Sequence, residues 1–165
     1  MTRAAVMIEV AKAVIGHPYL LGAKWKHGEW PAPNAPVDCS GLWTWALSMA
    51  LARYPVDMIG TPAGPVPTHA FLARFEGSAN QGALCREVSK LATLGPTGRG
   101  IFLLMRPGPD RHGHIAMSLG WGRTIESRGS KGVCIVKAVE NLRRWNGPNC
   151  YAGKIDALFE LVEEA

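Results

Sequence analysis

The sequence lacks the features that mark several large classes of protein. It has no apolar run near the ~18 residues that a membrane-spanning helix needs. No run of basic residues exceeds two, so the formal charge of +5 does not come from a nucleic-acid-binding arm. The four cysteines form no CxxC pair, which disfavours a zinc site, and no secretion signal supports a disulfide framework. We therefore expect a globular protein with reduced thiols and no metal, no stable membrane insertion and no nucleic-acid partner.

The first residues also lack the features of a signal peptide. Glu9 and Lys12 interrupt the apolar run, and no small-x-small cleavage site follows it. The stretch instead predicts an amphipathic helix from about Arg3 to Ile15, with one face formed by Val6, Val10 and Val14. Since no leader is seen, we expect synthesis in the cytoplasm.

The order of hydrophobic patterns predicts the fold class. Helical spacing over 39–53 indicates a central helix, and a short helix is expected around 69–75. Beyond Gly100, short apolar runs bounded by Gly, Pro or charge are typical of strands: IFLLMR, HIAMSL, RTIES and VCIVKAV. Helices followed by an antiparallel sheet predict an α+β fold. The chain has no repeat or long linker, so residues 1–165 are predicted to form one domain.

Cys39 stands where the central helix is expected to begin. Asp38 is a good helix-capping residue, and the small Ser40 and Gly41 leave the thiol open to approach. The helix dipole and the unpaired N–H groups at this position favour a thiolate, whereas the negative charge of Asp38 opposes it. A histidine partner would therefore decide whether Cys39 is a nucleophile or an inert core thiol.

His114 is the candidate partner, at the start of the strand HIAMSL. If a three-residue loop joins this strand to the next, Leu119 pairs with Arg123, and His114 shares a face of the sheet with Glu126 and Arg128. A two-residue loop would break this relationship.

On that geometry, Glu126 accepts a hydrogen bond from His114 and fixes its tautomer, as the third member of a triad does. Arg128 then either holds a substrate carboxylate or pairs with Glu126.

Three motifs in order resemble a known family. Asp38-Cys39-Ser40-Gly41-Leu42 resembles the D-C-S-G-L/F motif of the NlpC/p60 superfamily of papain-like cell-wall peptidases. The run from His114 to Gly120 is similar to its H-V-G/A-I-x-L-G strand, and Gly16 to Gly22 is similar to its G-x-P-Y-x-x-G segment. The resemblance covers the chain from about Val14 to Ser130.

The resemblance implies a papain-like fold and hydrolysis of peptidoglycan stem peptides, typically between D-glutamate and a diamino acid. Cys39 would be the nucleophile, His114 the base and acid, and Glu126 the orienting residue. The family commonly has His, Asn or Gln at that third position, so Glu126 departs from its pattern. The expected substrate-binding residues are Tyr19, Asp38, Ser40 and Arg128. No metal or organic cofactor is required.

Two other functions stay open. The same residues serve in amidases or acyltransferases that act on other amides, and a catalytically silent module could bind wall fragments, for instance in a phage tail. RTIESRG shows a fainter likeness to phage-borne or actinobacterial members of the superfamily. A wall hydrolase without a leader is expected to reach its substrate after lysis, phage delivery or injection, unless the domain was cut from a longer exported protein. Its partner would then be a phage tail, a secretion apparatus or an inhibitory protein.

Overall fold

The computed structural model describes residues 2–50, 60–61, 64–65, 99–105, 113–145 and 150–154. The helices are α1 (Arg3–Ala13), α2 (Cys39–Ala50) and α5 (Ala138–Arg144). The strands are β1 (Gly60–Thr61), β2 (Gly64–Pro65), β3 (Arg99–Met105), β4 (His114–Gly120), β5 (Arg123–Arg128), β6 (Gly132–Val136) and β7 (Cys150–Lys154). The short helix expected around 69–75 lies outside the described residues.

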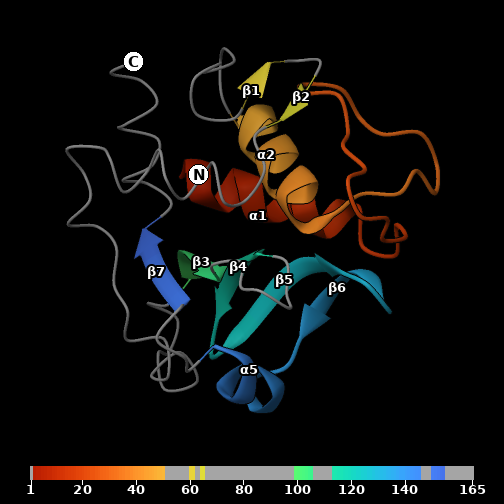
Figure 1. The fold of residues 1–165 in the computed structure, drawn as a ribbon. Coiled ribbons are helices and arrows are strands. Elements are labelled where there is room, and N and C mark those ends of the chain that lie inside the picture. Colours follow the sequence, from red (N-terminus) through yellow and green to blue (C-terminus); the bar gives the residue numbers. More distant parts are fainter. Residues whose placement is uncertain are drawn as a thin grey trace.

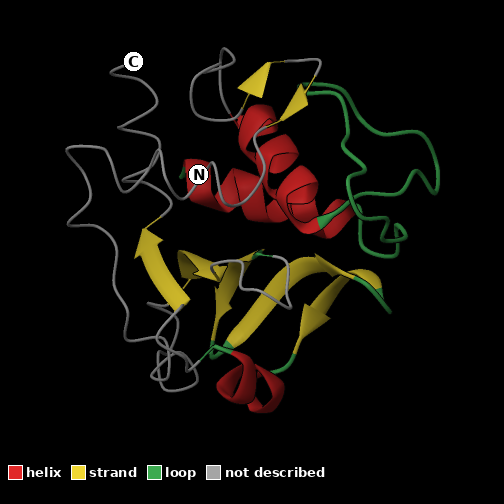
Figure 2. Ribbon diagram, viewed as in Figure 1, coloured by secondary structure: helices red, strands yellow, loops and turns green. Residues whose placement is uncertain are grey.

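A five-stranded antiparallel sheet forms the centre of the fold. Its strand order is β6-β5-β4-β3-β7, and β1 pairs with β2 in a separate ribbon. Helices α1 and α2 lie on one face of the sheet, and α5 lies against the other (Figures 1 and 2). This arrangement confirms the predicted α+β class with helices packed on an antiparallel sheet.

Helix α1 is shorter than predicted and packs through a different face. The hydroxyl of Thr2 caps it by accepting a hydrogen bond from the Ala5 N–H at 3.2 Å. The residues that it buries are Ala4, Met7, Ile8 and Ala11. Of the expected face, Val6 and Val10 are only partly buried, whereas Val14, just beyond the end of α1, is buried in the core.

Helix α2 is the central helix of the fold. Every residue from Cys39 to Ser48 is buried, as is typical of a helix that is apolar all round. Of the expected stripe of Leu42, Trp45, Ala46 and Met49, the first three are buried and Met49 is partly buried, but the stripe is not the only buried face. On the sheet, Ile115, Met117 and Ile125 belong to the same hydrophobic cluster. None of the helices in the described part of the chain is long and apolar enough to cross a bilayer.

The end of the sheet differs from the prediction. The run VCIVKAV was expected to be one strand, but β6 ends at Val136 and α5 begins at Ala138. Asn141 holds this helix to the sheet, because its Nδ2 donates to the carbonyl oxygens of Gly122 at 2.8 Å and Val136 at 3.3 Å. β7 was also not predicted, and it adds a strand beside β3.

Candidate active site

Cys39 is the first residue of α2. The Asp38 carboxylate accepts a hydrogen bond from the Gly41 N–H at 2.7 Å, so Asp38 caps the helix as expected. The Cys39 side chain is 8% exposed, and its Sγ lies 3.8 Å from the carbonyl oxygen of Gly113. The thiol therefore lies beside the residue that precedes β4.

The segment before α2 is fixed to the edge of the sheet. The Gly16 N–H donates to the Val133 carbonyl at 2.9 Å, and the Val133 N–H donates to the His17 carbonyl at 2.8 Å. Gly132 has φ +64°, and a Cβ there would come within 2.1 Å of the His17 carbonyl oxygen. Only glycine allows this close approach.

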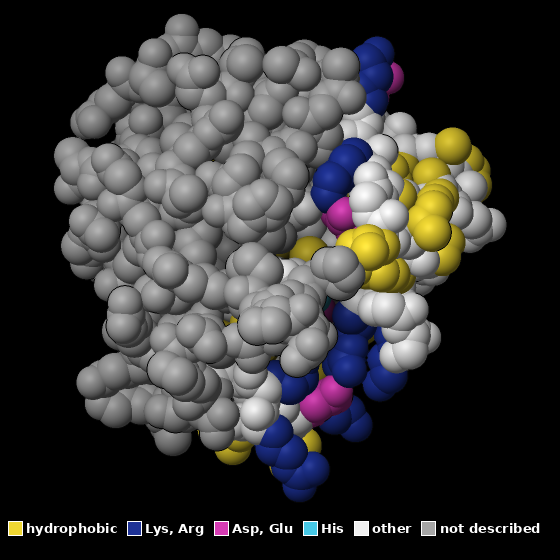
Figure 3. Space-filling view, in the orientation of Figure 1, with side chains coloured by type: hydrophobic (Ala, Val, Ile, Leu, Met, Phe, Trp, Pro, Cys, Tyr) yellow, Lys and Arg dark blue, Asp and Glu magenta, His cyan; other side chains and the backbone are white. Residues whose placement is uncertain are grey.

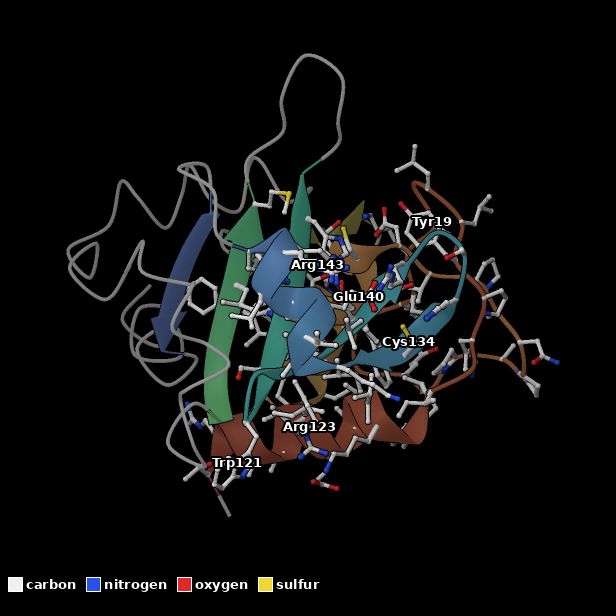
Figure 4. All side chains as sticks on the ribbon, turned by 90° about the horizontal axis from the view of Figure 1, so that it is seen from below. Tyr19, Trp121, Arg123, Cys134, Glu140 and Arg143 are labelled. Carbon is white, nitrogen blue, oxygen red and sulfur yellow. The ribbon has the colours of Figure 1, made fainter. Side chains whose placement is uncertain are left out.

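Tyr19 follows directly in this segment and lies close to the thiol. Burial raises the pKa of its phenol, and the nearby Cys39 and Asp38 raise it further. The phenol thus lies within electrostatic range of the candidate nucleophile. Figure 4 shows it on the segment between α1 and α2, on the side of the molecule where β5 joins β6.

The turn between β4 and β5 is not the one predicted. Gly120, rather than Leu119, pairs with Arg123 across a two-residue turn. A bulge between Ser118 and Gly120 then restores the register, so that Ser118 faces Thr124. The expected alignment of the two strands is therefore present because the bulge adds the residue that the turn omits.

This register brings His114 and Glu126 together. Nε2 of His114 contacts a carboxylate oxygen of Glu126 directly. The Glu126 side chain is fully buried, and it accepts further hydrogen bonds from Thr124 Oγ1 and from both terminal nitrogens of Arg144, each at 2.8 Å. Burial alone raises the pKa of Glu126, but the Arg144 and His114 partners hold it well below its usual range.

His114 connects the thiol and the carboxylate. Burial alone lowers its pKa, but hydrogen bonds to Cys39 and Glu126 and the charges of both raise the pKa to about 9. The ring of Trp145 lies against His114, with centroids 5.8 Å apart. The residues predicted as nucleophile, base and orienting group thus form one contiguous set in space, as a thiolate–imidazolium pair with a carboxylate requires.

Asp38 and Ser40 have a partner that the sequence did not indicate. The Lys24 ammonium contacts both Asp38 carboxylate oxygens and lies 2.6 Å from Ser40 Oγ. Asp38 also accepts from the Gly22 N–H at 3.0 Å and is 5% exposed. Lys24 thus compensates the charge of Asp38 beside Cys39. It lies in an irregular segment, so no periodic pattern points to this contact.

Arg128 and Arg144 are paired differently from the expectation. Arg128 donates to the Glu140 carboxylate at 2.6 Å, and Arg144 is the arginine that pairs with Glu126. Sequence reasoning missed Arg144 because the first two residues of its helix were read as the end of a strand and no element was predicted over 140–144. The signal was present in the charges, since Glu140 in the first turn and two arginines in the last turn favour a helix.

No group of three His, Cys, Asp or Glu side chains among the described residues is arranged to hold a metal ion.

No protein-family model matches the sequence, and no curated protein matches it. Solved structures do match. The peptidoglycan hydrolase RipB from Mycobacterium tuberculosis is 20% identical, with a TM-score of 0.52 over 93% of this chain and 64% of that one. The NlpC/p60 domain of the peptidoglycan hydrolase SagA is 19% identical, with a TM-score of 0.53 over 92% of this chain and 97% of that one.

The resuscitation promoting factor interacting protein RipA is 16% identical, with a TM-score of 0.51 over 92% of this chain and 61% of that one. The chain thus spans less than two thirds of the RipB and RipA chains and nearly all of the SagA domain. At these identities the likeness concerns the fold. The three ordered motifs predicted this outcome, and the chain has the papain-like α+β fold of NlpC/p60 domains.

Proposed function

We propose that the protein is a cysteine peptidase that hydrolyses an amide bond in peptidoglycan stem peptides, between D-glutamate and a diamino acid. The observation that carries the proposal is the contiguous set of Cys39, His114 and Glu126. The fold adds support, since RipB and SagA are described as peptidoglycan hydrolases.

The reaction begins with Cys39. Its thiolate attacks the carbonyl carbon of the scissile amide and forms a tetrahedral oxyanion. The Cys39 N–H, in the first turn of α2, is the candidate donor for that oxyanion. Collapse of the intermediate breaks the C–N bond and leaves a thioester on Cys39.

His114 moves the protons. Nε2 is engaged by Glu126, so Nδ1 is the nitrogen available to the thiol and the substrate. The imidazolium gives its proton to the leaving amine. The neutral ring then accepts a proton from water, whose oxygen attacks the thioester carbon; the C–S bond breaks and releases the carboxylic acid and the Cys39 thiolate, which restores the thiolate–imidazolium pair.

The charge of the protein suits this substrate. Lys and Arg side chains gather in a band on one face of the described surface (Figure 3). Stem peptides carry carboxylates, which such a surface attracts at moderate ionic strength.

The test is digestion of purified sacculi by wild type and Cys39→Ala, followed by mass spectrometry. We expect wild type to release fragments with a new amino group on the diamino acid, and Cys39→Ala to release none. Cys134→Ala is the matched control for loss of a thiol and is expected to keep activity.

Two results contradict the proposal. New amino groups at another bond identify an amidase or a peptidase of different specificity. Intact sacculi together with a Cys39 that reacts with iodoacetamide no faster than free cysteine indicate a silent module.

A further inference from the structure

The buried carboxylate of Glu126 lies between two cationic partners on different elements. His114 contacts it from β4, and the Arg144 guanidinium binds both of its oxygens from α5 at 2.8 Å. Arg144 is the only permanently charged group among the hydrogen-bond partners described for this carboxylate, because the third partner, Thr124, is neutral.

Helix α5 holds Arg144 in place. Asn141, one turn earlier, donates to Gly122 O at 2.8 Å and to Thr124 Oγ1 at 3.1 Å, which fixes the helix to the turn and to β5. The Arg144 guanidinium lies 5.7 Å from the ring centroid of Trp145, and Trp145 is 1% exposed and lies against His114. Arg144 is thus fixed by the same helix end that packs on the imidazole.

A buried carboxylate and an imidazole can share a proton in two ways. The proton stays on His114, which gives an ion pair, or it moves to Glu126, which gives two neutral groups. Removal from water favours the neutral pair, because each buried charge costs solvation energy. A second, fixed cation on the carboxylate favours the ion pair.

We propose that Arg144 is a positioning residue that keeps Glu126 ionised and aligned, so that the proton stays on His114 and the thiolate of Cys39 keeps its cationic partner. Arg144 touches neither the thiol nor a substrate in this role. It acts through Glu126 alone.

Other charged or titratable groups surround this set on each neighbouring element. Cys39 faces His114 from α2, and Cys134 on β6 stands directly opposite Glu126. Arg128 on β5 is paired with Glu140 on α5. The pH dependence of Cys39 alkylation is therefore expected to come from the titration of Cys39, His114 and Glu126, with these other groups as neighbours.

The first test measures alkylation of Cys39 by iodoacetamide across pH in Arg144→Met and Arg144→Lys. Arg144→Met is expected to slow alkylation at neutral pH by about tenfold or more, the equivalent of about one pKa unit. Arg144→Lys, which keeps the charge but loses the two-point contact, is expected to lie between Arg144→Met and wild type. Arg143→Met, the same change at the adjacent exposed residue, is the control and is expected to match wild type.

The second test separates positioning from a merely structural role. In a Glu126→Gln background there is no carboxylate charge to hold, so Arg144→Met is expected to have little further effect on the pH profile. If Arg144→Met slows the alkylation of Cys39 equally at every pH in both the wild-type and the Glu126→Gln backgrounds, the proposal is overturned. If Arg144→Met does not fold by circular dichroism, Arg144→Lys carries the test, and an alkylation profile identical to wild type would overturn it.

The inference rests on the proposed function only where hydrolysis of sacculi is the readout. Arg144→Met is expected to lower kcat on sacculi more than it changes KM. If wild type leaves sacculi intact while the alkylation profiles behave as expected, the proposed substrate is wrong and the role of Arg144 stands.

Discussion

His114 and Glu126 lie on adjacent antiparallel strands, and Nε2 of the one contacts the carboxylate of the other. Glu126 is buried and His114 is partly buried, and the pair connects the start of α2, which carries Cys39, with the end of α5, which carries Arg144. The site is therefore assembled from four elements, each of which contributes one side chain to a continuous path of hydrogen bonds.

The pH dependence of hydrolysis should report His114. Its folded-state pKa of about 9 lies above the ordinary value of 6.5, so the imidazolium is present at lower pH and is lost as pH rises through about 9. We expect kcat/KM to decline on the alkaline side near pH 9, measured with a soluble stem peptide. A decline centred near pH 6.5 would contradict the coupling of His114 to Cys39 and Glu126.

Glu126→Gln should move the alkaline decline of kcat/KM. The amide keeps the shape of the side chain but loses the negative charge that raises the pKa of His114. We expect the alkaline decline of kcat/KM to shift to lower pH. We also expect kcat to fall roughly 100-fold, the lower end of the usual contribution of general acid–base catalysis. An unchanged pH profile in Glu126→Gln would show that the carboxylate charge is not used.

Glu126 should also affect stability in acid. The pKa of Glu126 is lowered in the folded state, so the ionised carboxylate stabilises the fold at pH values above the ordinary pKa of 4.5. This stabilisation is lost as the pH falls below 4.5. The thermal stability of wild type, measured as its Tm, should therefore fall steeply below pH 4.5. Glu126→Gln is expected to show a flatter dependence over the same range, and parallel curves would contradict this account.

Lys24→Met should lower the reactivity of the Cys39 thiol. Without the ammonium, the buried charge of Asp38 beside Cys39 is uncompensated, and a nearby negative charge disfavours the thiolate. We expect alkylation of Cys39 at neutral pH to slow roughly tenfold. Lys26→Met, two residues away at an exposed ion pair with Glu29, is the control and should react as wild type does.

Gly132→Ala should destabilise the protein and displace Tyr19. The added methyl group would meet the His17 carbonyl at 2.1 Å, and φ at this position is +64°. We expect a loss of at least about 2 kcal/mol in the free energy of unfolding, from backbone strain and the clash. Gly129→Ala, where a Cβ meets nothing within 4 Å, is the matched control and should change stability little.

Much of the fold followed from local patterns. Asp38 caps α2 as predicted, because capping depends on residues within one turn. The α+β class and the four strands from Arg99 to Val136 also follow from the order of apolar runs. The two elements that were not predicted are α5 and β7. Both are short, and they contain too few apolar residues to show a helical or a strand periodicity.

The sequence by itself indicated Cys39 as the candidate nucleophile and His114 as its candidate partner, and it placed Glu126 on the face of His114 only by assuming a three-residue loop. Tertiary structure alone decided three things: the bulge that offsets the two-residue turn, the Lys24 contact with Asp38, and the Arg144 contact with Glu126. The reason is physical. A cap or a strand period is set by neighbours along the chain, whereas the charge that neutralises a buried carboxylate comes from whichever distant segment the packing brings within hydrogen-bond distance.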